Sequence, residues 1–196
     1  MAKSKKTIKK RFISVDIPIL NKEIEILGSG IKDLDGRTIK LDLTHDLKGR
    51  AIDLKLLVKA DDEKAIANPI ELKLFQSYMK RMVRKGTDYS EDSIKTNCKD
   101  EKIIIKPLMI TRKRVTRSVL RGLREIARKE ITDYVSKKNF ETILSEILSG
   151  DFQKEIQPKL KKVYPLSLFE IKFMGIDKKE VYEEEDEKET KEEVKE

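Results

Sequence analysis

The sequence predicts an α+β fold, and three observations lead to this prediction. Residues 12–59 alternate apolar and polar side chains with a period of two, residues 71–86 and 111–164 hold apolar side chains at helical spacing, and residues 167–176 alternate again. A period of two is typical of half-buried strands, and a period near 3.6 is typical of amphipathic helices. Strands followed by helices and a closing strand favour an α+β architecture.

The first third of the chain predicts four strands, separated where glycines allow tight turns. The predicted strands are FISVDIPI (12–19), KEIEILG (22–28), RTIKLDL (37–43) and AIDLKLLVK (51–59). The segment DDEKAIANP (61–69) that follows is rich in loop-forming residues, and we expect it to be a loop.

The period then changes, and ELKLFQSYMKRMVRKG (71–86) predicts a helix that ends at Gly86. Residues 88–98 and 102–110 predict two strands of a hairpin, joined by the polar segment 99–101. The second strand is almost entirely apolar, so we expect it to run through the core. Pro107 within it indicates a sheet edge or a bulge.

Residues 111–137 predict an amphipathic helix with a basic face and an apolar face. At 100° per residue, the basic face holds Arg117, Arg121, Arg124 and Arg128, with Arg114 nearby. The opposite face is apolar and includes Ile131 and Tyr134, and the strands at 12–59 and 88–110 need such a cover. An arginine row that advances about 5.4 Å per turn suits the repeat of phosphates along a nucleic acid.

Two shorter helices and a strand complete the prediction. The helix at 139–150 has Asn139 as its N-cap, and the helix at 151–164 has Asp151 as its N-cap. Pro158 is expected to kink or divide the second of these helices. The alternating segment SLFEIKFMGI (167–176) predicts the last strand.

Charge divides the chain into three parts. The formal net charge is +8, but residues 177–196 hold 11 acids and 5 bases, which leaves 39 bases and 25 acids in the first 176 residues. We therefore expect a basic arm at 1–11, a single α+β domain at 12–176 and a disordered acidic tail at 177–196. The basic body favours a polyanionic partner, either a nucleic acid or acidic lipid headgroups.

Three groups of basic residues are candidates for RNA contact. They comprise the arm residues Lys5, Lys6, Lys9, Lys10 and Arg11, the patch Lys80, Arg81, Arg84 and Lys85, and the row Arg112, Lys113, Arg114, Arg117, Arg121, Arg124 and Arg128. A charged helix face is often merely solvated, yet 111–130 holds six arginines against two lysines, and only two acids. Arginine offers a planar fork that fits phosphate, which favours nucleic-acid contact. For the nearby aromatic residues Phe12, Tyr78 and Tyr89, we expect core packing rather than base stacking.

The chain offers little for catalysis or metal binding. His45 is the only histidine, Cys98 is the only cysteine, and Gly28-Ser29-Gly30 lacks the rest of a phosphate loop. We therefore predict no catalytic residues, no metal site and no cofactor, and we expect the Gly-Ser-Gly segment to form a turn. No apolar run approaches the roughly 20 residues needed to cross a bilayer. Binding to a membrane surface remains a weaker alternative, because the apolar face of 115–135 lacks Trp and Phe.

With these residues in view, the chain resembles the archaeal and eukaryotic small-subunit ribosomal protein family S3Ae, also called eukaryote-type S1. The resemblance covers roughly residues 10–176. Four stretches carry it: LDGRTIKLDLTHDL (34–47), YMKRMVRKGTDYSEDSIKTNCKDEKIIIKPLMITRKR (78–114), RGLREIARKEI (121–131) and VYPLSLFEIKF (163–173).

The resemblance implies an antiparallel, barrel-like β core flanked by helices. It also implies a non-enzymatic constituent of the cytoplasmic ribosome, on the platform of the small subunit near the messenger exit channel. The implied partners are small-subunit ribosomal RNA, neighbouring platform proteins and messenger RNA, with no membrane. The alternative function is a non-ribosomal regulatory adaptor that binds nucleic acid.

Overall fold

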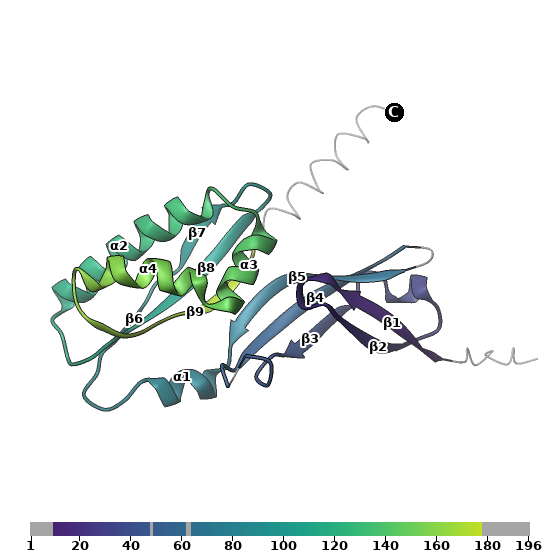
Figure 1. Cartoon of the computed structure of the whole chain (residues 1–196), viewed down its shortest axis with the longest axis horizontal. Coiled ribbons are helices and arrows are strands. Elements are labelled where there is room, and N and C mark those ends of the chain that lie inside the picture. The colour runs from purple at the N-terminus through teal and green to yellow at the C-terminus, as the bar shows by residue number, and fades with distance from the viewer. Residues whose placement is uncertain (1–9, 48, 62–63, 178–196) are drawn as a thin grey trace, which may run out of the picture. The chain divides into compact units, whose positions relative to one another are not determined.

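The computed structural model of the chain describes residues 10–47, 49–61 and 64–177 (Figure 1). Most of the predicted acidic tail and of the basic arm lies outside these residues. The chain forms two compact units, one up to Ile70 and the other from Glu71. It passes from the first to the second within strand β5 (Ala65–Leu74).

The first unit is built mainly from strands. They are β1 (Arg11–Ile17), β2 (Lys22–Gly28), β3 (Thr38–Asp42), β4 (Ile52–Ala60) and the first part of β5. β1 and β2 pair antiparallel around a short 3-10 turn, η1 (Pro18–Leu20), and β3 pairs antiparallel with β4. β4 also pairs with β5, and β1 meets β5 in parallel at a single position.

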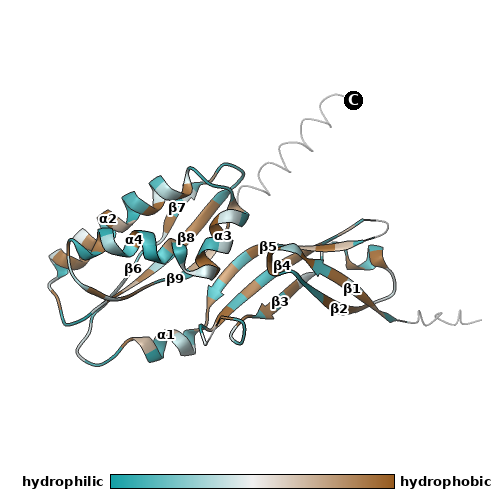
Figure 2. Cartoon of the chain, viewed as in Figure 1, coloured by the Kyte–Doolittle hydropathy of each residue, from teal (hydrophilic) through white to brown (hydrophobic). Residues whose placement is uncertain are grey.

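Alternation along β4 shows why these residues form a sheet. Ile52, Leu54, Leu56 and Val58 are fully buried, while the residues between them are partly exposed. The same alternation of hydrophobic and hydrophilic residues is visible along the strands of this unit (Figure 2). A second 3-10 turn, η2 (Ile31–Leu34), adds Leu34 to the core.

The second unit is a sheet covered on one face by helices (Figure 1). Its strands are the end of β5, β6 (Tyr89–Glu91), β7 (Ile94–Asn97), β8 (Lys102–Thr111) and β9 (Leu166–Ile176). β8 is central because it pairs antiparallel with β6, β7 and β9, and β9 pairs in turn with the end of β5. β8 is also hydrophobic along most of its length (Figure 2).

Three helices form the cover, and a fourth lies apart from them. They are α2 (Arg117–Val135), α3 (Phe140–Ser149) and α4 (Asp151–Lys161), whereas α1 (Gln76–Met82) stands alone in Figure 1. α2 contacts β6 and β7, α4 contacts β9 and α2, and α3 contacts α4. The predicted role of the basic helix as a cover is therefore confirmed for the strands at 88–110.

Most predicted elements are confirmed. The strand at 22–28 and the helix between Asn139 and Gly150 have the predicted bounds, and Gly150 ends α3 with a φ of 87°. The register of β8 shifts between Lys106 and Pro107, which confirms the predicted bulge. Pro158, by contrast, does not divide α4, and α4 ends at Lys161 rather than near residue 164.

Some local predictions are wrong. The helix predicted at 111–137 begins only at Arg117, the strand predicted at 88–98 is divided into β6 and β7, and Gly150 takes the N-cap position of α4 that was predicted for Asp151.

Two further predictions are wrong, and both concern β5. The predicted loop at 61–69 contains the start of this strand, and the predicted helix at 71–86 begins only at Gln76. Asn68 and Pro69 suggest a loop, but Ala65 and Ala67 are buried, and Glu71–Lys73 pair with β9. Pairing with distant strands therefore outweighs the local preferences of this segment.

The expected barrel-like closure is not confirmed. The strands pair in the order β2-β1-β5-β9-β8-β6, and no pairing within the described ranges joins the two ends of this order. The expectation of a wholly antiparallel core is wrong for one pair, because Asp16 of β1 meets Ile66 of β5 in parallel. The observed class is a mixed α+β protein with nine strands and four α-helices in the described residues.

Replacing Ile131 on the buried side of α2 should destabilise the protein strongly. The side chain is fully buried, so Ile131→Ala should lower the free energy of unfolding by about 2–5 kcal/mol. The exposed neighbour Lys129→Ala should change it by less than about 0.5 kcal/mol. Urea denaturation measures both values, and equal values would show that α2 does not pack by this stripe.

Candidate nucleic-acid interface

The basic loop at 112–114 is held in place by a threonine and an aspartate. Thr111 is fully buried, and its hydroxyl accepts a hydrogen bond from the backbone N–H of Asp88 at 3.1 Å. The same hydroxyl lies 2.8 Å from the carbonyl oxygens of Asp88 and Lys113. The Asp88 carboxylate accepts a further bond from the backbone N–H of Val115 at 2.8 Å. The loop backbone is therefore fixed on both sides, while the side chains of 112–114 are exposed.

Helix α2 presents its arginines to solvent along one face, as predicted. Arg117, Arg121, Arg124 and Arg128 are all exposed, and Leu123, Ala127, Ile131 and Val135 are buried on the opposite side. The buried residues recur every four positions, so they form one stripe. Burial of this stripe turns the arginine face outward.

The four arginines differ in what holds them. Arg121 donates through Nε to the Glu125 carboxylate at 2.9 Å, an exposed i,i+4 pair. Arg128 donates to Asp92, which lies between β6 and β7. Arg117 and Arg124 make no ion pair with any described residue.

A shallow hollow lies on this face. It is lined by Asp92, Arg121, Arg124, Glu125, Arg128 and Lys129. The lining holds four cationic and two anionic side chains, so its net charge is positive. Such a hollow attracts small anionic groups, including phosphates.

The acid Glu130 does not face the arginine row. It forms an ion pair with Lys159 of α4, in which the Lys159 Nζ lies 2.6 Å from Glu130 Oε2. The hydrogen bond to Glu130 raises the pKa of Lys159 above its ordinary value, against the opposing effect of burial. The pair links α2 to α4 and leaves Glu125 as the only acid of 111–130 on the basic side.

The second predicted patch lies in and after α1. Lys80, Arg81, Arg84 and Lys85 are exposed, and the Arg81 guanidinium lies 5.6 Å from the centre of the Tyr78 ring. Beyond Lys85 the chain turns at Gly86, whose φ of 86° favours glycine. The structure does not bring this patch together with the arginine face of α2 (Figure 1).

The predicted basic arm is described only at its end. Lys10 and Arg11 are exposed at the start of β1, and Lys5, Lys6 and Lys9 lie outside the described residues. The arm belongs to the first unit, and the other two groups belong to the second.

The predictions for the aromatic residues are partly wrong. Tyr78 is buried as predicted, but Phe12 is 70% exposed and Tyr89 is 53% exposed. Phe12 pairs across the hairpin with exposed Leu27, and Tyr89 begins the short strand β6, which pairs only with β8 among the described strands. Both rings are therefore accessible to a partner.

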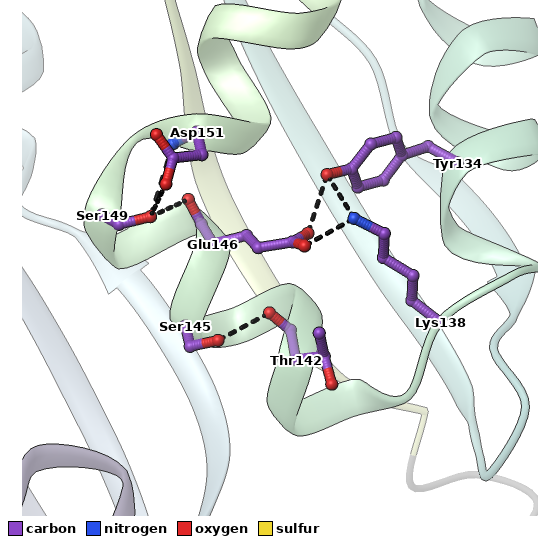
Figure 3. Close-up of polar contacts among 7 residues, drawn as sticks. All are labelled: Tyr134, Lys138, Thr142, Ser145, Glu146, Ser149 and Asp151. Carbon is purple, nitrogen blue, oxygen red and sulfur yellow. Dashed lines mark hydrogen bonds and ion pairs between the residues drawn. The ribbon is translucent and has the colours of Figure 1, made fainter.

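A polar cluster that the sequence analysis missed joins α2 to α3 (Figure 3). Tyr134 donates its hydroxyl proton to Glu146 at 2.8 Å, and Lys138 Nζ donates to the Tyr134 oxygen at 2.6 Å and to Glu146. The Tyr134 ring also meets Phe152 of α4 edge-on, with ring centres 5.1 Å apart. The sequence predicted Tyr134 only as part of the apolar face, and its hydroxyl was the one signal of a polar contact.

The surroundings raise the pKa values of both Tyr134 and Lys138, which favours the protonated form of each side chain. Burial raises the pKa of Tyr134 above its ordinary value of 10.0, and contact with Glu146 adds to this rise. Burial alone would lower the pKa of Lys138, but the hydrogen bonds to Glu146 and Tyr134 outweigh it and raise that pKa above 10.5. Tyr134 and Lys138 therefore keep their protons at neutral pH, and the contacts that these protons make are maintained.

The residues considered for other chemistry have local roles. His45 is exposed in the turn after β3, and Ser29 of the Gly-Ser-Gly segment donates to Asp33 at 2.9 Å beside η2. Cys98 is buried, and its thiol donates to the Glu101 carbonyl. Within the described ranges, no group of three or more His, Cys, Asp or Glu side chains could hold a metal ion. No helix of the described chain is long and apolar enough to span a membrane.

The pKa shifts of the polar cluster predict a loss of stability in alkaline solution. A raised pKa stabilises the folded state below the unfolded pKa, near 10.5 for Lys138, and this contribution is lost as pH rises through the folded pKa. The difference in melting temperature between wild type and Lys138→Met should therefore be largest at neutral pH and shrink at more alkaline pH. Exposed Lys137→Met should show little difference throughout. A difference in melting temperature between wild type and Lys138→Met that does not change with pH would contradict the pairing of Lys138 with Tyr134 and Glu146.

Comparison with known proteins points to one family. The model of the Ribosomal S3Ae family matches residues 3–180. Relatives named small ribosomal subunit protein eS1 include that of Methanothermobacter thermautotrophicus, 28% identical over 132 residues, or 66% of this chain and 68% of the relative. The protein of the same name from Haloarcula marismortui is 27% identical over 180 residues, or 86% and 83%. That from Nanoarchaeum equitans is 27% identical over 110 residues, so the match spans 56% of either chain.

The family match covers all of the described residues, including those of α2 and of the loop before it. The prediction that the chain is not an enzyme is confirmed, since this is a family of structural ribosomal proteins. The resemblance found in the sequence is confirmed as well: the chain belongs to the Ribosomal S3Ae family.

Proposed function

We propose that the protein is a structural constituent of the small ribosomal subunit and binds ribosomal RNA. One observation carries the proposal. Loop 112–114 and the outer face of α2 form a surface rich in arginine, and this surface rests on a buried scaffold. The name shared by the archaeal relatives, small ribosomal subunit protein eS1, supports it.

The proposed mechanism is electrostatic and involves no change in covalent bonds. Side chains of the loop and of α2 neutralise phosphates of one RNA segment. The patch around α1, residues 80–85, and the arm residues, including Lys10 and Arg11, neutralise phosphates elsewhere. Because α1 stands apart from α2, the chain contacts more than one segment and holds the segments together. Exposed Phe12 and Tyr89 are available to stack on bases.

The location proposed within the ribosome is the platform of the small subunit, near the messenger exit channel. This location follows from the family resemblance of the four sequence stretches, as do contacts with neighbouring platform proteins and with messenger RNA. In this proposal residues 12–176 act as one RNA-binding region, and the protein supports translation in the cytoplasm by stabilising the platform.

Removing the arginine row should weaken RNA binding and its dependence on salt. Each phosphate contact contributes roughly 0.7–0.9 to the slope of log affinity against log salt, so replacing Arg117, Arg121, Arg124 and Arg128 with Ala should reduce the slope by about 3. Filter binding to a small-subunit ribosomal RNA transcript at several salt concentrations measures this slope. A wild-type slope near zero would contradict the mechanism.

The matched control removes the same charge from another surface. Lys40, Lys55, Lys59 and Lys64 lie on or beside strands of the first unit. Their replacement with Ala should leave most of the slope intact. Equal losses in both quadruple variants would indicate that net charge, and not the face of α2, determines binding. Circular dichroism melting should show cooperative unfolding for both variants.

Sedimentation separates the proposed function from the alternative. A tagged copy of the chain in extracts of its source cells should sediment with small ribosomal subunits at moderate salt. A non-ribosomal regulatory adaptor would instead remain in the light fractions. Recovery only in those fractions would overturn the ribosomal assignment and leave nucleic-acid binding to be tested separately.

A further inference from the structure

We propose that the hollow beside α2 seats one phosphodiester group of the RNA backbone, and that Asp92 is the residue that positions Arg128 for it. The inference rests on the proposed function and assigns a particular role within it. Asp92 is an acid on a basic surface, so its own negative charge does not favour RNA binding. Its contacts with Ser93 and Arg128, however, give it a role.

Asp92 is fixed before it meets the arginine. It lies between β6 and β7, and its side chain is only 14% exposed. Its Oδ1 accepts a hydrogen bond from the backbone N–H of Ser93 at 2.9 Å. A carboxylate held in this way offers a defined point of attachment for a cation.

Arg128 uses one end of its guanidinium group to bind this point. Its Nη2 lies 3.1 Å from Asp92 Oδ1 and 2.9 Å from Oδ2. The Arg128 side chain remains 62% exposed. The N–H groups on Nη1 and Nε make no hydrogen bond to any described residue, so these donors on either side of the Asp92 contact remain available to an anion.

The rest of the hollow supplies further cationic groups. Arg124 lies between Arg121 and Arg128 on the same face and is without an ion pair in the described chain, and Lys129 also lines the hollow. A phosphodiester carries one negative charge on two non-bridging oxygens, which a guanidinium edge binds in a bidentate manner. The excess positive charge of the lining exceeds what one such group neutralises, so binding is electrostatically favourable.

Ordering of Arg128 explains why an acid here would help binding rather than oppose it. A free arginine side chain samples many rotamers, and part of this conformational entropy is lost when it binds a phosphate. Attachment to Asp92 restricts the side chain before RNA arrives. If Asp92 served only to join α2 to the hairpin, its charge would repel RNA, and its removal would strengthen binding.

The positioning role and the purely structural role predict opposite changes in RNA affinity, and Asp92→Asn distinguishes between them. The substitution is nearly isosteric and keeps Oδ1 as an acceptor for Ser93. Binding of the full chain to fluorescein-labelled poly(U) RNA should weaken about 3–10-fold, the loss of part of a charge-assisted hydrogen bond. The salt slope should fall toward that of Arg128→Gln, which is expected to lose roughly 0.7–0.9.

Asp133→Asn is the matched control. Asp133 is an exposed aspartate of α2, the helix that carries Arg128, but it lies outside the hollow, and its substitution removes the same charge as Asp92→Asn. It should bind RNA as tightly as wild type or slightly more tightly. The double variant Asp92→Asn with Arg128→Gln should bind like Arg128→Gln alone, because Asp92 acts through Arg128.

A second substitution keeps the test valid if Asp92→Asn unfolds. Arg128→Lys preserves the charge and the pair with Asp92 but removes the additional donors on Nη1 and Nε. It should weaken poly(U) binding severalfold. Unchanged binding by Arg128→Lys, or binding by folded Asp92→Asn that equals or exceeds that of Asp133→Asn, would overturn the positioning role and leave the proposed function intact. Failure of the wild-type chain to bind either poly(U) or ribosomal RNA would overturn both.

Discussion

The orientation of the basic surface depends on the burial of one apolar stripe of α2. Leu123, Ala127, Ile131 and Val135 contribute this stripe, and each is fully buried. Because a helix is rigid over this length, fixing one side determines where the other side points. The cluster around Tyr134 and the pair between Glu130 and Lys159 add directional contacts that oppose rotation of the helix. The arginines therefore point outward because of contacts that other residues of the helix make.

Acidic residues near this surface have different positions and different effects. Glu130 forms an ion pair with Lys159 of α4, and Glu125 forms an exposed ion pair with Arg121. Asp92, which lies in another part of the chain, forms an ion pair with Arg128. Exposed pairs of the Glu125 kind contribute little to stability. A mostly buried carboxylate such as Asp92 holds its partner more firmly. A cationic surface can therefore gain order from a few acids while it keeps its positive charge.

Local patterns predicted much of the fold, since short-range preferences agree with the packing there. The strand at 22–28, the caps of α3 and the bulge at Pro107 all follow from residues close in sequence. The strand β5 could not be predicted in this way, because its stability comes from pairing with β4 and β9. Asn68 and Pro69 gave a misleading local signal.

The candidate site shows the same division. Helical periodicity predicted which arginines are exposed, since only the pattern of one segment is needed. It could not predict which of them are held, because Asp92 lies 36 residues from Arg128. In the same way, the role of Tyr134 depends on Glu146 in the next helix. Side-chain pairs between separate elements require the fold itself.

The central position of β8 has a consequence for folding during synthesis. Its partner β9 begins at Leu166 and also pairs with the end of β5. Neither β8 nor the end of β5 can form its pairing with β9 until this strand, the last one described, has been synthesised. Pairing over such long stretches of chain is slow to form. Until then, α4 lacks the strand that it contacts, and β8 lacks one of its neighbours. A nascent chain at this stage exposes apolar surface and cations together, which makes early RNA contact or chaperone protection advantageous.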